Sequence, residues 1–262
     1  MGSQIHNFLS EFYGSLNIQL QLVRQQLILR YRRTALGFLW TLINPLLMIS
    51  IMAVVFSALF KQDLTTFALT LFAGMIPWNF LNSVVTQSCT AFLNNEGLIK
   101  KVYLPKVIFP SSIVAALLFD SLLSFIVLFF VIIILGGTFT WALLFLPFSF
   151  ILLFCFAFGL ALIMSVATVF FRDLRHVIVL MMQALFFISP ILYKPEALGG
   201  YAATLVSMNP VTPFIALFRI PLVNGELPPI GTLLPAVIFA IISMSFGIFI
   251  FIREEKKIIF RL

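Results

Sequence analysis

Few side chains in this 262-residue chain are of the types that carry out covalent or metal chemistry. It has two histidines, His6 and His176, far apart in sequence, and two cysteines, Cys89 and Cys155. A zinc site or a serine hydrolase needs histidine to converge with other ligands or with a nucleophile, and neither histidine falls within an apolar segment. No Gly-Lys-Ser or Gly-Lys-Thr occurs, so the chain lacks a phosphate-binding P-loop. We therefore predict that this chain is not an enzyme and binds no cofactor or metal.

Asp120 is the one carboxylate within a long apolar stretch. A charged side chain that faces lipid costs a few kcal/mol, so such a residue marks a special environment. It could be an ion or proton site, or it could face a neighbouring helix or a subunit seam and bond to Ser or Thr. A proton relay normally contains more than one ionisable group, which favours the second interpretation.

The elements that must position Asp120 are apolar. Hydrophobic residues make up 62% of the chain and charged residues 10%, with a mean hydropathy of +1.15, whereas soluble domains are about 45–50% apolar and about 25% charged. A spanning helix needs about 20 apolar residues, so the composition predicts an all-α integral membrane protein with six spans. Both cysteines fall inside these spans, where buried thiols behave as small hydrophobic groups, so no disulfide is expected. The predicted spans are 36–60, 67–90, 108–135, 141–168, 177–193 and 230–252.

The basic residues fall mostly on one side of these spans. Thirteen lie on the side of the termini, and three lie on the other: Lys61, Lys194 and Arg219. Because Lys and Arg are enriched in cytoplasmic loops, the split predicts a multi-pass protein of the cytoplasmic (inner) membrane with both termini in the cytoplasm. The net charge of +7 is then a signal of topology, and no nucleic-acid partner is expected.

Residues 1–33 predict a cytoplasmic amphipathic helix that precedes the six-span domain, 34–262. Apolar side chains recur at spacings of three and four, which is one stripe along a helix. Such a helix lies in the membrane interface or packs on the protein's own loops, and we favour the interface because the stripe runs straight towards the first span. Arg30, Arg32 and Arg33 would then contact lipid headgroups.

Two loops on the cytoplasmic side mix charged with apolar residues. In loop 93–106 we predict a short helix that presents a mixed surface to a soluble partner; a simple surface turn is the alternative. The next loop, at 170–176, has the same character. The candidate docking residues are Asn95, Glu96, Gly97, Leu98, Ile99, Lys100, Lys101, Arg172, Asp173 and Arg175.

The outer segment between spans five and six is rich in proline, yet too apolar for a watery loop. Proline interrupts helices, so no span of ordinary length fits here. Two short re-entrant helices that dip into the outer leaflet satisfy both constraints. A folded external hairpin above the membrane is the alternative.

Four motifs, in the same order along the chain, resemble the membrane subunits of ABC exporters for O-antigen polysaccharide and wall teichoic acid. The run from Arg24 to Leu46 resembles the entry to the first span in that family, and Asn95 to Pro110 resembles the loop after the second. Phe170 to Arg175 is similar as well, as is Ser189-Pro190-Ile191 followed by Asn209-Pro210.

The resemblance implies a homodimer that pairs with two copies of a separate nucleotide-binding ATPase subunit, which would hold the ATP and Mg. It also implies that residues 96–101 form the coupling helix that docks on the ATPase, and that segment 194–229 forms outer gate helices. The implied substrate is a polymer carried on an undecaprenyl lipid, such as O-antigen or teichoic acid.

We therefore expect an exporter subunit that contacts membrane lipids and an undecaprenyl-linked glycan. Aromatic faces suit sugar rings, so Trp78, Phe80 and Tyr193 are candidates to line the conduit. The alternatives are an ABC exporter of a drug or small lipid and, in a different class, a membrane scaffold or lipid-modifying enzyme.

Overall fold

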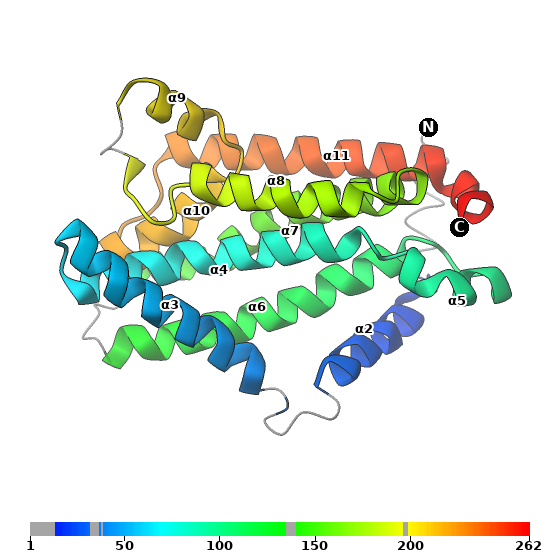
Figure 1. Cartoon of the computed structure of the whole chain (residues 1–262), viewed down its shortest axis with the longest axis horizontal. Helices are drawn as coiled ribbons and strands as arrows, with labels where there is room; N and C mark the ends of the chain where they lie inside the picture. Colours follow the sequence, from blue (N-terminus) through cyan, green and yellow to red (C-terminus); the bar gives the residue numbers. More distant parts are fainter. Residues whose placement is uncertain (1–13, 32–36, 38, 135–139, 196–198) are drawn as a thin grey trace.

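A computed structural model of the chain describes residues 14–31, 37, 39–134, 140–195 and 199–262, and every regular element in these ranges is helical. The long helices form one bundle (Figure 1): α3 (Leu39–Phe60), α4 (Leu64–Ser88), α6 (Ile108–Ile134), α7 (Leu146–Phe170), α8 (Leu174–Ile188) and α11 (Ile230–Arg261). The shorter elements are α2 (Leu16–Tyr31), η1 (Leu93–Asn95), α5 (Glu96–Lys101), η2 (Trp141–Phe145), α9 (Gly200–Met208), α10 (Thr212–Arg219) and η4 (Ile220–Asn224). The predicted all-helical fold class is confirmed.

Five segments within the described residues are long and apolar enough to cross a membrane: Leu42–Phe60, Leu64–Ser88, Ile108–Val131, Trp141–Phe170 and Ile230–Arg261. They correspond to the predicted spans one, two, three, four and six. The count rises to six if the bent pair formed by Gly200–Met208 and Thr212–Asn224 is taken as one span.

The predicted fifth span, 177–193, corresponds to α8, which is shorter than expected. Its 15 residues extend about 22 Å at 1.5 Å per residue, less than the roughly 30 Å of a hydrocarbon core. The helix ends at Ile188 because Pro190 disfavours a helical conformation at Ser189, which is extended at φ −78° and ψ 137°. Hydropathy alone placed the end at Tyr193, so the proline sets this boundary.

Helices α7 and α11 pack with their backbones almost in contact. A Cβ atom on Gly159 would lie 2.3 Å from the carbonyl carbon of Ser243, and one on Gly247 would lie 2.4 Å from the carbonyl oxygen of Gly159. Ser243 Oγ also donates to the carbonyl oxygen of Phe156 at 2.8 Å. Small residues permit this close approach, so α7 and α11 form a closely packed pair of helices.

Helix α2, the described part of the predicted interface helix, packs against α6. Gln26 Nε2 donates to Ser112 Oγ at 3.0 Å, while Leu16 and Leu20 remain exposed. The helix therefore contacts the rest of the protein and also exposes apolar side chains. The predicted interface helix also included residues 1–13, and the predicted headgroup contacts were Arg30, Arg32 and Arg33. These residues, or in the case of Arg30 its side chain, lie outside the part of the chain that the structure describes.

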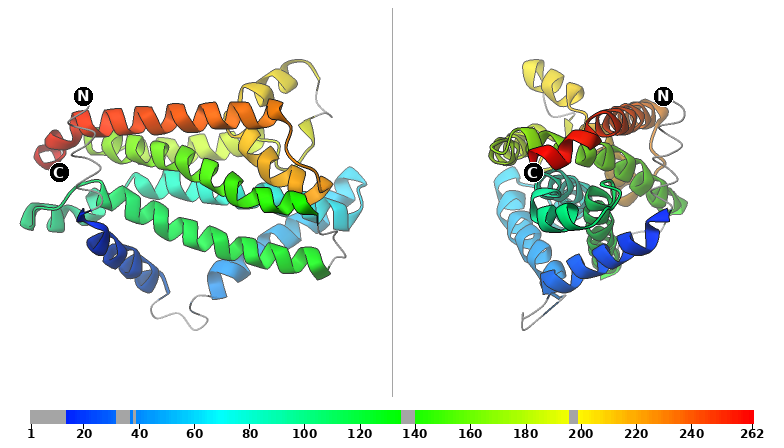
Figure 2. Two further views of the ribbon diagram at one scale, coloured as in Figure 1. Left: turned by 180° about the vertical axis from the view of Figure 1, so that it is seen from behind. Right: turned by 90° about the vertical axis from the view of Figure 1, so that its right-hand side faces the viewer.

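The outer segment forms two short helices, as predicted. Helix α9 stands away from the bundle in both views of Figure 2, whereas α10 packs against α4, α7 and α11. The two are bent by 86°. Helix η4 then ends at Gly225, whose φ of 71° and contact with Thr140 suit glycine, because a Cβ there would lie 2.9 Å from Thr140 Cγ2.

Candidate functional site

Loop 93–106 contains the predicted short helix, α5. Its Ile99 is buried, which fixes the helix on the bundle, while Leu98 is partly exposed and Tyr103 is 89% exposed. Lys100 Nζ donates to Glu96 Oε1 one turn away, as a Glu and Lys at i and i+4 on a helix commonly do. The result is a short helix that presents both ions and apolar side chains at its surface.

The turn between α7 and α8 lies at the same end of the bundle as α5 and the C-terminus (Figure 1). The hydrogen bond from Lys100, together with the charge of that residue, holds the pKa of Glu96 below its ordinary value, and the charge of Arg172 acts in the same direction. Phe171, Arg172 and Asp173 are exposed beside it. The structure thus brings the two predicted docking loops together, and we name residues 96–103 and 171–175 the coupling face.

Within the coupling face, Arg175 turns towards its neighbour in sequence. Its Nε donates to His176 Nε2 at 3.2 Å, and both side chains are exposed. Of the docking residues, Asn95 instead caps the preceding turn, because its Nδ2 donates to the carbonyl oxygen of Ala91 at 2.8 Å. Asn95 therefore caps a turn of its own loop, whereas Lys101, Arg172 and Asp173 are exposed at the surface.

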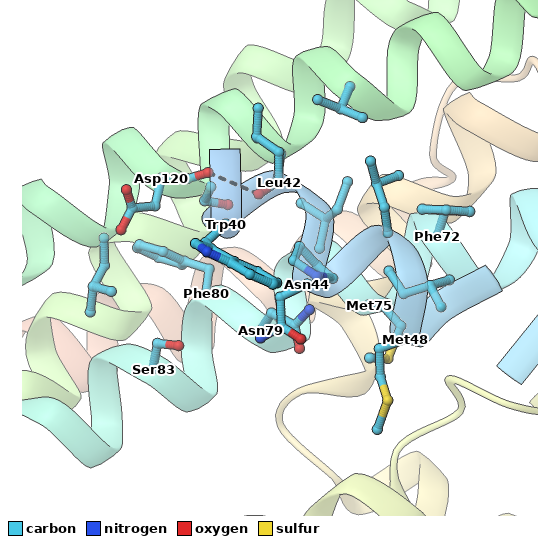
Figure 3. Close-up of a pocket in the computed structure, with 18 of the residues that line it drawn as sticks. Trp40, Leu42, Asn44, Met48, Phe72, Met75, Asn79, Phe80, Ser83 and Asp120 are labelled. Atoms are coloured by element: carbon cyan, nitrogen blue, oxygen red, sulfur yellow. Dashed lines mark hydrogen bonds between the residues drawn. The ribbon is translucent and has the colours of Figure 1, made fainter. Parts of the chain in front are cut away.

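A cavity of about 650 Å³ lies between α3, α4 and α6. Asp120 and Phe80 both line it, so the structure brings the intramembrane acid and one aromatic candidate together (Figure 3). The other polar lining residues are Asn44, Asn79, Ser83, Gln87, Ser121 and Ser124. Ser124 Oγ donates to the backbone carbonyl of Asp120 at 2.9 Å.

The other two aromatic candidates lie elsewhere. Trp78 is 4% exposed and packs against Phe186 of α8, with 5.6 Å between ring centroids. Tyr193 donates from its hydroxyl to the carbonyl oxygen of Ile188 at 2.8 Å. The three residues therefore do not line one surface of this chain.

Trp40, Asn44 and Asn79 in the cavity were not identified from the sequence. One signal was present: Asn79, Ser83 and Gln87 recur every four residues, so they share one face of an otherwise apolar helix. That spacing could have indicated a polar face on span two. It could not have shown that Asp120 of span three borders the same space.

A hydrogen-bond cluster joins the two proline motifs of the outer segment. Arg219 Nη2 donates to the carbonyl oxygens of Pro190 at 2.6 Å and Ile191 at 3.1 Å. Asn209 Nδ2 donates to Ser189 Oγ at 2.9 Å, and its Oδ1 accepts from the backbone N–H of Val211. The end of α8 is therefore tied to Arg219 at the end of α10 and to Asn209 just before its start.

The rest of the described chain offers no alternative centre for metal chemistry. Within those residues, no three His, Cys, Asp or Glu side chains gather closely enough to hold an ion. Cys89 and Cys155 are both free thiols. The features available for function are therefore the coupling face, the cavity and the joined proline motifs.

Together these features define a multi-pass helical membrane protein with charged loops at one end and a broken helix pair at the other. The chain belongs to the ABC-2 type transporter family, whose profile matches residues 19–223. It is the membrane component of a transporter and not an enzyme, as predicted, and such subunits pair with ATPase subunits.

Several characterised proteins are similar to it over most of their length. The O-antigen export system permease protein RfbA of Myxococcus xanthus is 27% identical over 249 residues, which are 94% of this chain and 96% of that protein. RfbA of Klebsiella pneumoniae is 28% identical over 79% of this chain and 80% of its own. The polysialic acid transport protein KpsM of Escherichia coli is 24% identical over 88% of this chain and 90% of its own.

Proposed function

We propose that this chain is the membrane subunit of an ATP-driven exporter that moves a lipid-linked polysaccharide, such as O-antigen or teichoic acid carried on undecaprenyl, out across the cytoplasmic membrane. The observation that carries this proposal is the likeness, over most of both chains, to proteins named for the export of O-antigen and the transport of polysialic acid. The amide-rich and aromatic cavity in a membrane helix bundle supports it, because such a lining suits sugars.

Two copies of this chain and two copies of the ATPase would form the complete exporter. The coupling face is the part of the chain that suits docking, because exposed Tyr103 and Phe171 lie beside the Glu96–Lys100 ion pair. Closure of the ATPases on ATP would push on α5, and the spans would follow as rigid bodies.

Segment 194–229 would be the outer gate. The bend between α9 and α10 lies near the hydrogen bonds that Arg219 makes with the segment after α8. Because these bonds hold α10 in place, α9 could move about the bend without unwinding a full span. Tying α10 to the end of α8 would carry the movement of α8 to the gate.

Deletion of the chromosomal gene for this chain, followed by complementation, tests the function. We expect the deletion strain to lose surface polysaccharide and to accumulate undecaprenyl-linked glycan on the cytoplasmic side, and the wild-type chain to restore export. Normal surface glycan in the deletion strain would contradict the proposal. Sensitivity to a drug, with normal glycan, would instead support export of a drug or small lipid.

A further inference from the structure

Helix α11 continues beyond the length that a membrane requires. Its apolar stretch, 230–252, extends about 35 Å at 1.5 Å per residue, which already exceeds a hydrocarbon core of roughly 30 Å. Residues 253–261 stay helical for about another 13 Å, and we name them the α11 extension. We propose that the α11 extension is a third element that docks on the ATPase, beside the two loops of the coupling face, an inference that rests on the proposed function.

The α11 extension is anchored next to both loops of the coupling face. Phe251, just before it, lies 6.4 Å from Phe92 between ring centroids, and Phe92 immediately precedes η1, which leads into α5. Near its end, Arg261 Cζ lies 5.8 Å from the centre of the ring of Phe170, the last residue of α7. Ile258 between these two anchors is fully buried. The α11 extension therefore continues the surface of the coupling face.

The charges of the α11 extension are separated between two faces. Arg253, Lys256 and Lys257 are exposed, whereas Glu254 and Glu255 are half-buried. Glu254 accepts a hydrogen bond from Lys257 Nζ at 2.9 Å and lies 3.4 Å from Arg253 Nε. Because the cations project further than the carboxylates, the outer face is positive on balance. Such a face suits a patch of Asp and Glu side chains on a partner.

Phe260 adds an apolar group to this positive face. It is 87% exposed, and Ile259 beside it is 39% exposed. Basic residues at this end also follow from the predicted topology, because Lys and Arg are enriched in cytoplasmic segments. That rule gives no reason to expose a phenylalanine. An aromatic side chain with charged residues around it is typical of a protein–protein contact, and Tyr103 and Phe171 are exposed in the same way on the coupling face.

The position of the α11 extension favours the ATPase over lipid headgroups or a second copy of this chain. The right-hand view of Figure 2 shows its red turns crossing the end of the bundle in front of the other helices. Its outer face therefore points away from the spans, whereas a helix that binds headgroups turns its apolar side towards the acyl chains. Two copies that met symmetrically through this face would bring like charges together.

Photo-cross-linking from Phe260 tests the contact in the full chain. In the deletion strain that expresses this chain, Phe260 is replaced by p-benzoylphenylalanine, and the cross-linked peptides are identified by mass spectrometry. We expect an adduct with an ATPase that carries a P-loop. The same replacement at Tyr201, which is 91% exposed on α9 at the other end of the bundle, is the control and should give no such adduct. Adducts of Phe260 with lipid or a second copy, and none with an ATPase, would overturn the proposal.

Two variants measure the contact with the purified ATPase that this cross-link identifies. Phe260→Asp should weaken its binding to the full chain about tenfold, as removal of an aromatic anchor does. Lys256→Glu should weaken binding severalfold, and the effect should shrink as salt is added. Lys194→Glu, at an exposed cation of the outer segment, is the matched control and should have no effect.

The thermal midpoint separates docking from folding. Phe260 and Lys256 are exposed, so both variants should keep the midpoint of the wild type. If Phe260→Asp lowers it, Phe260→Ser, which adds no charge, gives the same comparison. Wild-type binding of the ATPase by the Phe260 variant that keeps its midpoint would overturn the proposal.

Failure of this contact and failure of the proposed function are distinguishable. If the wild-type chain restores surface polysaccharide to the deletion strain but Phe260→Asp binds the ATPase normally, the α11 extension does not dock and the exporter function stands. If the wild-type chain restores no polysaccharide, the exporter function fails even where Phe260 cross-links to an ATPase.

Discussion

Arg219 on α10 donates a 2.6 Å hydrogen bond from Nη2 to the carbonyl oxygen of Pro190, which lies two residues beyond the end of α8. The contact joins two segments that are 29 residues apart. The same guanidinium reaches the carbonyl oxygen of Ile191. One side chain thus supplies hydrogen bonds to backbone acceptors that the proline break in α8 leaves outside a helix.

Arg219→Met should destabilise this junction by about 2 kcal/mol, because it removes charged hydrogen bonds to partly buried carbonyl oxygens. The thermal midpoint of the detergent-purified protein, followed by size-exclusion chromatography after heating, should fall. Lys194→Met, at an exposed residue of the same segment, is the control and should leave the midpoint unchanged. An unchanged midpoint for Arg219→Met would mean that the carbonyl oxygens find other partners.

Gly159→Val should disrupt the pairing of α7 and α11. A Cβ at Gly159 would overlap the backbone of Ser243 at 2.3 Å, and backbone cannot move aside as a side-chain tip can. We expect a loss of more than about 3 kcal/mol and poor recovery from the membrane.

Gly231→Ala is the matched control for Gly159→Val. Gly231 lies on α11 with nothing within 4 Å of its would-be Cβ, so alanine there should be neutral or slightly stabilising. Comparable losses for the two variants would show that the loss at Gly159 does not come from its contact with the backbone of Ser243.

Glu96→Lys should weaken binding of the ATPase partner severalfold, because it reverses a charge on the coupling face. Pull-down of the partner at several salt concentrations measures the effect. The double variant Glu96→Lys/Lys100→Glu restores an ion pair within α5 but exchanges the positions of its charges. We expect the double variant to stay weak. Full recovery would show that the pair acts by stabilising α5 and not by meeting the partner.

Cysteine accessibility tests the orientation. In spheroplasts of a Cys89→Ser/Cys155→Ser background, Tyr103→Cys should resist a membrane-impermeant maleimide until the membrane is permeabilised. Trp141→Cys should react at once, because Trp141 is 88% exposed and belongs to the predicted outer side. Immediate labelling of Tyr103→Cys would place the coupling face on the outer side of the membrane and contradict the proposed topology.

Local patterns predicted the elements well. The uncharged stretches predicted α3, α4, α6, α7 and α11, and the mixed residues of loop 93–106 predicted α5. Each of these depends on neighbours in sequence. The end of α8 was missed because hydropathy does not register that Pro190 constrains Ser189.

Relations between distant residues could not be predicted in this way. Trp78 and Phe80 are two positions apart on one apolar helix, yet one packs on α8 and the other lines the cavity. The recurrence of Asn79, Ser83 and Gln87 marks one face of α4, but it does not indicate which helix that face meets. The approach of Arg172 to Glu96 likewise depends on how the helices pack, which no local pattern records.

The contact between Gly159 and Ser243 limits how this molecule can deform. The backbones of α7 and α11 are almost in contact at this point. The two helices therefore cannot slide past each other without first moving apart. The 32 residues of α11 extend about 48 Å, well beyond a hydrocarbon core of roughly 30 Å. The pair therefore resists relative sliding, and a push on the C-terminal part of α11 would be passed along the pair to α10, which packs against both helices.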